Sequence, residues 1–469
     1  MVNSQSHAAG VPAGRNDPEG ASPSLEQLGY KQELKRSLSL FDLVVYGLVI
    51  ISPATFGLFG IVFNKSAGMV PLVYLVGFVP MLFTAMGYAF LSREFPVAGS
   101  VYSYAGRTIG QSAGFIAGWL MLLDYALIPT LVYVVAAIQI HAVLPDIPPW
   151  LAVAVPLIFC TCINLLGIET TARTNGIFLA LNLTILAIFL VAGVLALGNG
   201  TAGAHLSIQP FWNAELVSPS LIFSALSFGM LAYLGFDAIS TLAEESKGKS
   251  LWLGKATLIT LFILVPLFVI QNYLACLFVL DRSSFPNGVA PDGAFYDIAG
   301  TIAGPWLKFL TSVGNLVVVG VPMAMAAQVA TARLLFSMAR DGKLPRVLAS
   351  VHARRKVPDR AILLVATVTL VLSLTLVGHL ELLASLLSFG ALSGFLLLHL
   401  SVVVHFMWRN QSKDWLRHLV VPLLGFTIIA CALVNAATNA KIVGLAWLAV
   451  GGVLLVGLKL KGKQATLRV

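Results

Sequence analysis

Charged side chains are scarce in this 469-residue chain, at 10% of its residues, whereas soluble domains contain about 25%. Apolar residues make up 58% of the sequence. This composition excludes an ordinary soluble protein. It predicts an all-α polytopic membrane protein instead.

Cysteine is also rare, and all four cysteines lie inside apolar runs: Cys160, Cys162, Cys276 and Cys431. They are expected to be small buried hydrophobic residues, with neither a disulfide nor a metal site. No group of His, Asp or Glu shows metal-binding or acid–base spacing, which argues against a membrane enzyme. We expect no cofactor other than a coupling ion.

The first residues lack an apolar core and are rich in Gly, Pro, Ser and Asn. This composition predicts a disordered tail over 1–35, without a cleavable signal peptide. At the other end, 460–469 is expected to be a second cytoplasmic tail.

Twelve apolar runs are long enough to cross a bilayer, which needs about 20 residues. They lie at 41–64, 69–91, 112–144, 150–168, 176–198, 219–243, 254–280, 303–338, 361–379, 381–408, 418–438 and 442–459. If both termini are cytoplasmic, only four of the 29 Lys and Arg residues fall outside: Lys65, Arg282, Lys308 and Lys441. The positive-inside rule therefore predicts twelve spans in the cell membrane with this orientation, and it explains the net charge of +9 without a nucleic-acid partner.

Two of these spans are interrupted near their middle. The first contains Ser-Pro-Ala-Thr at 52–55 followed by Gly57, and the sixth contains Gly235 and Asp237. Proline removes a backbone donor and glycine weakens a helix. Unpaired backbone groups are costly in lipid, so such breaks persist only where protein or a water-lined cavity satisfies them. One break in each half predicts a secondary transporter, although a simple proline kink is the structural alternative.

Three motifs point to one family. They are PVAGSVYSY at 96–104, GFDA at 235–238 with AEES at 243–246, and ARLLFSMARDGKLP at 332–345. Together they resemble the amino acid–polyamine–organocation permeases over the chain after residue 30. SPATFG at 52–57 and LLDY at 122–125 resemble the putrescine-importer branch, whereas many amino acid permeases carry a Gly-Ser/Ala-Gly run in the first span.

The resemblance implies a leucine-transporter-like fold with two inverted five-helix repeats, 36–198 and 219–408, and two peripheral helices at 418–459. It also implies discontinuous helices 1 and 6, with the substrate between them. Helices 3, 8 and 10 would close the cavity.

At the first break, the amides of 56–59 could bind a substrate carboxylate and the carbonyls of 50–52 an ammonium group or a coupling cation. Asp124 and Asp237 lie inside spans that hold no comparably deep Lys or Arg. An acidic interior favours a cationic substrate. Proton carriage is the alternative for both, and Asp237 could instead act as a helix N-cap.

Thirteen residues are therefore expected to bind substrate: Ser52, Pro53, Ala54, Thr55, Phe56, Gly57, Asp124, Tyr125, Phe228, Tyr233, Gly235, Phe236 and Asp237. The aromatic members would enclose an ammonium group through cation–π contacts, and ordinary packing is their alternative role.

Five further residues are candidates for coupling or gating: Asn182, Glu244, Glu245, Thr331 and Arg333. Proton-coupled relatives often carry a lysine where the resemblance places Asn182, and asparagine cannot carry a proton. A sodium site that includes Thr331, a proton shuttle through Asp124 and ion-free exchange all remain open. We expect Glu244 and Glu245 to pair with Arg333 or Arg340, as a gate.

The predicted function is secondary transport of amino acids or polyamines by alternating access, with a cationic amine such as putrescine favoured. A neutral amino acid permease or exchanger is the main alternative. A channel or receptor on the same scaffold is more distant, because the polar residues cluster at two breaks rather than along a continuous stripe.

Overall fold

The computed structural model describes residues 25–143, 146–248, 251–286, 289–376, 379–435 and 438–460. Most of the predicted N-terminal tail, and 461–469 of the C-terminal tail, lie outside these ranges. The described residues form helices and no strand, apart from one isolated bridge between Leu38 and Ser246. The helices are α1 (Leu40–Ile51), η1 (Phe56–Leu58), α2 (Phe59–Ser66), α3 (Val70–Glu94), α4 (Val101–Thr108), α5 (Gln111–Val143), α6 (Pro149–Leu166), α7 (Ile168–Gly198), η2 (Thr201–Gly203), α8 (Pro219–Leu231), η3 (Phe236–Glu245), α9 (Leu251–Cys276), α10 (Val289–Ala303), α11 (Pro305–Val313), η4 (Gly314–Gly320), α12 (Val321–Arg340), η5 (Arg346–Ala349), α13 (Asp359–Thr375), α14 (Leu380–Val402), η6 (Val403–Arg409), η7 (Leu416–Val420), α15 (Val421–Val434) and α16 (Thr438–Leu460).

Ten helical stretches in the described ranges are long and apolar enough to cross a membrane. The two predicted spans missing from that number are also helical. One is α13, which has 17 residues, and the other is divided into α8 and the 3₁₀ segment η3. The chain is thus a multi-pass membrane protein, and twelve crossings remain a prediction.

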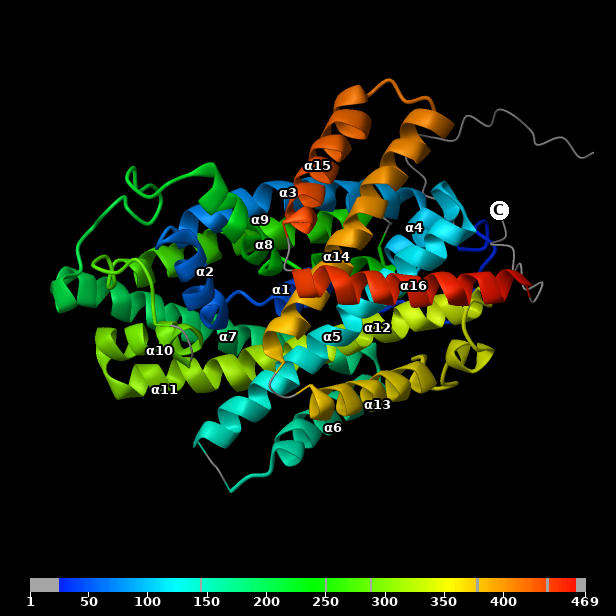
Figure 1. Ribbon diagram of the computed structural model, residues 1–469. Coiled ribbons are helices and arrows are strands. Elements are labelled where there is room, and N and C mark those ends of the chain that lie inside the picture. The colour runs from blue at the N-terminus through cyan, green and yellow to red at the C-terminus, as the bar shows by residue number, and fades with distance from the viewer. Residues whose placement is uncertain are drawn as a thin grey trace, which may run out of the picture.

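The connections between helices gather at two opposite ends of the bundle (Figure 1). At the end formed by α2, α10 and α11, Asn64 Nδ2 donates to the Phe285 carbonyl. At the end formed by α4 and the N-terminal segment, Lys35 pairs with Glu169 across 3.0 Å. A chain that crosses a bilayer repeatedly has its helices span the membrane and its connections at the two membrane faces. The two ends of the bundle fit this arrangement.

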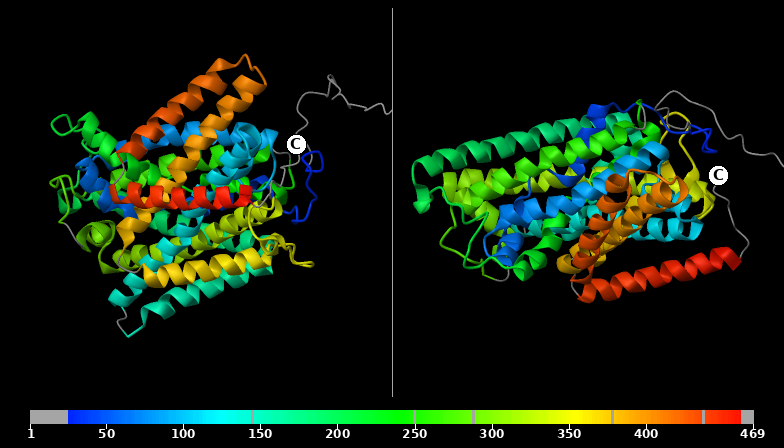
Figure 2. Two further views of the ribbon diagram at one scale, coloured as in Figure 1. Left: turned by 45° about the vertical axis from the view of Figure 1, so that its right-hand side comes forward. Right: turned by 90° about the horizontal axis from the view of Figure 1, so that it is seen from above.

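Helix α5 lies at the centre, where it packs against α14, α12, α4 and α6. The C-terminal α16 lies at the periphery of the bundle (Figure 2). It is held by the Trp119 and Trp447 rings, which stack at 4.4 Å between centroids. Each indole N–H donates to the backbone carbonyl of the other tryptophan. These two hydrogen bonds satisfy both indole N–H groups, which would be costly to leave unpaired in lipid.

Helices α3 and α8 approach closely through glycine. A Cβ on Gly229 would lie 2.7 Å from Val73 Cγ1 and 2.9 Å from the Val73 carbonyl oxygen. Small residues allow backbones to come this close in membrane bundles. The contact matters for the site because α8 leads directly into the second break.

We expect Gly229→Leu to lower the thermal unfolding temperature of the purified protein, because the added side chain must force α3 and α8 apart. Overpacking of this kind typically costs about 1–3 kcal/mol. Gly176→Leu on α7 is the control, since a Cβ there meets nothing within 4 Å. Equal unfolding temperatures for the two variants would contradict the close packing of α3 and α8.

The structure corrects two predictions. Residues 25–35 were assigned to the disordered tail, yet Leu25 and Leu34 are only 4% and 3% exposed. These leucines are ordered because they bury apolar surface against the bundle.

Cys160 and Cys276 are buried as expected, but Cys162 and Cys431 are exposed. An apolar run predicts membrane depth without saying which side of the helix faces lipid.

Candidate functional site

The predicted break in the first span is present. Helix α1 ends at Ile51, and Ser52 follows with a φ of 72°. The chain resumes helical structure at Phe56 in η1 and continues into α2. A positive φ strains a residue that has a Cβ, so the surrounding contacts must hold Ser52 in place.

Side chains from α9 satisfy the backbone at this break. Gln271 Oε1 accepts from the Thr55 N–H at 3.1 Å, and Gln271 Nε2 donates to the Pro53 carbonyl at 2.8 Å. Asn272 Nδ2 donates to Thr55 Oγ1 at 2.9 Å. The sequence analysis missed this pair, although two adjacent amide side chains within an apolar span were a visible signal.

The second break meets the first. Helix α8 ends at Leu231, and Gly235 has a φ of 113° before η3 begins. A Cβ on Gly235 would lie 3.3 Å from the Ile50 side chain and 3.5 Å from the Ile50 carbonyl oxygen. The two interruptions, far apart in the sequence, therefore touch.

Asp237 follows the second break but does not cap it. Gly235 occupies the N-cap position of η3, so the N-cap alternative for Asp237 was wrong. Asp237 Oδ2 instead accepts a hydrogen bond from the Tyr125 hydroxyl. Ser100 Oγ lies 3.3 Å from the hydroxyl oxygens of both Tyr88 and Tyr125. Helices α3, α4 and α5 thus bring polar groups to η3.

Asp124 and Asp237 form a buried acidic pair, each with no exposed surface. Both carboxylate oxygens of Asp124 and Oδ1 of Asp237 have no hydrogen-bond partner. Tyr125, the chain neighbour of Asp124 on α5, is hydrogen-bonded to Asp237, so the two aspartates lie on adjoining elements. No salt bridge in the described ranges involves either residue. Buried carboxylate oxygens without partners are disfavoured as anions, so the three unpartnered oxygens of this pair favour a proton or a cation nearby.

The predicted aromatic residues separate into two groups. Phe236 stacks on Phe395 beside Tyr88, one of the tyrosines near the acidic pair. The other three make different contacts. Phe56 stacks on Phe295 at 4.3 Å, the Tyr233 hydroxyl donates to the Tyr74 carbonyl, and the Phe228 ring lies 6.0 Å from Lys65 Nζ.

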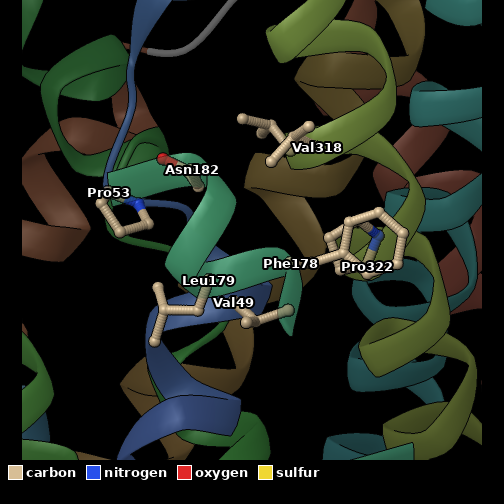
Figure 3. A pocket seen from close by; sticks show the side chains of 8 residues that line it. Val49, Pro53, Phe178, Leu179, Asn182, Val318 and Pro322 are labelled. Carbon is tan, nitrogen blue, oxygen red and sulfur yellow. The ribbon is translucent and has the colours of Figure 1, made fainter. Parts of the chain in front are cut away.

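Asn182 reaches the first break from α7, where its Nδ2 donates to Ser52 Oγ at 3.2 Å. It lines a narrow crevice between α7 and the helix formed by η4 and α12 (Figure 3). The crevice is too narrow to hold a water molecule. Thr331, on α12, donates its hydroxyl to the Ala327 carbonyl of its own helix.

An ion-pair layer, defined as Glu244, Glu245, Arg333 and Arg340, joins η3 to α12. Arg333 binds Glu245 through two hydrogen bonds of 3.0 and 2.9 Å, and both side chains are buried. Arg340 binds Glu244 through two of 2.9 and 2.7 Å. Both predicted pairings are confirmed. Glu244 Oε1 also accepts from the Ala98 N–H, so the three sequence motifs converge here.

An N-terminal strap, residues 25–39, covers this layer. The Tyr30 ring lies 4.0 Å from the Arg340 guanidinium, and its hydroxyl donates to Asp341 Oδ1 at 2.9 Å. Burial raises the pKa of Tyr30 to about 12 and also raises the pKa of Asp341. Gln32 Nε2 donates to the Glu244 carbonyl, and the Leu38 N–H donates to the Glu245 carbonyl. The composition of the tail gave no signal for these contacts.

A sequence profile described as amino acid permease matches residues 38–453 of this chain. The chain belongs to the amino acid permease family. The match spans both breaks, the acidic pair and the ion-pair layer. The protein is accordingly a permease rather than an enzyme.

Several relatives of this permease have named substrates. The low-affinity putrescine importer PlaP of Escherichia coli K12 is 32% identical over 426 residues, covering 89% of this chain and 92% of that protein. The branched-chain amino acid permease BcaP of Bacillus subtilis is 28% identical over 450 residues, covering 90% and 92%. The methylthioribose transporter of Bacillus subtilis is 28% identical over 423 residues, covering 84% and 86%. Because these names differ in substrate, the substrate of this permease has to be inferred from its site.

Proposed function

We propose that this permease carries cationic amines, diamines such as putrescine above all, by alternating access. The observation that carries the proposal is the buried acidic pair, in which three of the four carboxylate oxygens lack a hydrogen-bond partner. An ammonium group supplies the positive charge and the donors that these carboxylates need. The likeness to a putrescine importer supports the same substrate class.

In this proposal the site residues have distinct roles. Asp124 and Asp237 bind the ammonium groups, and Tyr125 orients Asp237 through its hydrogen bond. The ring of Phe236 contributes a cation–π contact, which is typically worth about 0.5–2 kcal/mol. Carbonyls at 50–52 provide further acceptors at the first break.

We also propose twelve crossings with both termini in the cytoplasm, and inverted repeats at 36–198 and 219–408. The distribution of Lys and Arg supports this orientation. The contact between the breaks supports the repeats, since each half would contribute one interrupted helix. The ion-pair layer would then be the cytoplasmic gate, and it must separate when the site opens inward.

Coupling follows one of three routes: a proton on Asp124, a sodium ion near the first-span carbonyls and Thr331, or exchange without an ion. The bond from Asn182 to Ser52 supports a structural role for the fifth span, because an amide cannot deliver a proton there. Uptake driven separately by a pH gradient, a sodium gradient and internal substrate distinguishes these routes.

We expect a competition panel in proteoliposomes to rank putrescine first, arginine second, and leucine and glutamate last. The physical reason is the acidic interior, which attracts cations and repels a carboxylate. Uptake of labelled putrescine is the measurement, with protein-free liposomes as the control. Competition by leucine without competition by putrescine would show a neutral amino acid permease, the alternative that the likeness to BcaP favours.

A further inference from the structure

Several N–H groups of the first break are already occupied. N-terminal amides of a half-helix are the groups that bind anions, including a substrate carboxylate. Here the Thr55 N–H donates to Gln271 Oε1, and the Ala54 N–H donates to Ser52 Oγ at 3.1 Å. The Leu58 N–H donates to the Thr55 carbonyl. Three of the five residues at 54–58 thus already use their donors inside the protein.

Gln271 is fully buried, and both ends of its amide are engaged. Its oxygen accepts from Thr55, while its nitrogen donates to the Pro53 carbonyl and to the Leu267 carbonyl at 2.9 Å. The side chain therefore presents to the break the acceptor that a carboxylate would otherwise present. It does so without adding a negative charge beside the acidic pair.

The charge of the buried Arg333 is already balanced by Glu245, which accepts hydrogen bonds from its Nε and Nη2. Its Nη1 has no hydrogen-bond partner. A substrate carboxylate at the first break would find three of its N–H groups occupied, and the buried carboxylates of Asp124 and Asp237 would add electrostatic repulsion. Both effects disfavour an anion, because like charges repel strongly at low dielectric.

We propose that Gln271 is a specificity-determining residue, which disfavours α-carboxylates by occupying the Thr55 N–H of the first break. This inference rests on the proposed function and narrows it. The permease takes amines without a carboxylate, and it discriminates against amino acids that consist of the same amine with an added α-carboxylate.

Two matched pairs of compounds test the inference. Ornithine is putrescine with an added α-carboxylate, and lysine is cadaverine with the same addition. Inhibition constants for all four are measured against labelled putrescine uptake in the wild type and in Gln271→Ala. We expect ornithine to bind the wild type at least about tenfold more weakly than putrescine. In Gln271→Ala the ratio of the ornithine and putrescine inhibition constants falls by about tenfold, because the freed Thr55 N–H can donate to the carboxylate of ornithine.

Two further variants separate specificity from folding. Gln328→Ala removes another buried glutamine, whose amide bonds to Thr161 rather than to the break, and should leave the ratio unchanged. Gln271→Glu keeps an acceptor for Thr55 and should retain or increase the discrimination against ornithine, even if Gln271→Ala does not fold.

Equal inhibition by ornithine and putrescine in the wild type overturns the inference alone. The absence of putrescine uptake overturns the proposed function, and the inference with it. An unchanged ratio in folded Gln271→Ala, or reduced discrimination in Gln271→Glu, also overturns it.

Discussion

We expect Asp124→Asn to abolish uptake of putrescine while the protein stays folded in the membrane. The substitution keeps the size of the side chain but removes the charge that the substrate ammonium would neutralise. Truncating one member of a buried charge pair usually costs about 2–5 kcal/mol, so uptake should fall about thirtyfold or more. Initial rates in proteoliposomes measure the effect, and thermal unfolding of the purified protein reports the fold.

Asp297→Asn is the matched control for this variant. Asp297 pairs with Lys308, but its side chain is 62% exposed, and exposed ion pairs contribute little. The control should transport like the wild type. Normal uptake in Asp124→Asn would reduce Asp124 to a structural residue and remove the main support for a cationic substrate.

We expect Arg333→Gln to destabilise the protein strongly. Glu245 would remain buried without its cationic partner, and breaking a buried pair in this way costs about 3–5 kcal/mol. The unfolding temperature should fall by several degrees, and uptake should be lost. Arg417→Gln is the control, because Arg417 is 66% exposed in its pair with Asp414.

The double variant Arg333→Met, Glu245→Leu separates stability from gating. Replacing both members of a buried pair with apolar residues is often neutral or stabilising. We expect the unfolding temperature to recover while transport remains impaired, because the pair must open and close during the cycle. Recovery of both properties would show that the layer is structural and not a gate.

The sequence predicts those features that depend on local chemistry. Proline and glycine interrupt the first and sixth spans regardless of how the helices pack against one another. Both breaks could therefore be predicted from the sequence. The pairing of Glu244 and Glu245 with arginine was also foreseeable, because few opposite charges lie near those span ends. Each of these features needs only the residue types and their membrane depth.

Other features depend on which helix faces which, and periodicity does not determine that. Gln271 looks like any polar residue in an apolar run until α9 is placed against the first break. Tyr30 belongs to a segment with the composition of a disordered tail, and only the neighbouring Arg340 and Asp341 make it ordered. The exposure of Cys162 and Cys431 similarly required the orientation of their helices.

The contact between Gly235 and Ile50 has a mechanical consequence. Because a Cβ on Gly235 would lie only 3.3 Å from the Ile50 side chain, the two interrupted helices are in close contact. A tilt of one half-helix toward either membrane face would therefore press on the other. Coupled tilting of this kind would favour opening on one face at a time, which limits leakage of the membrane gradient.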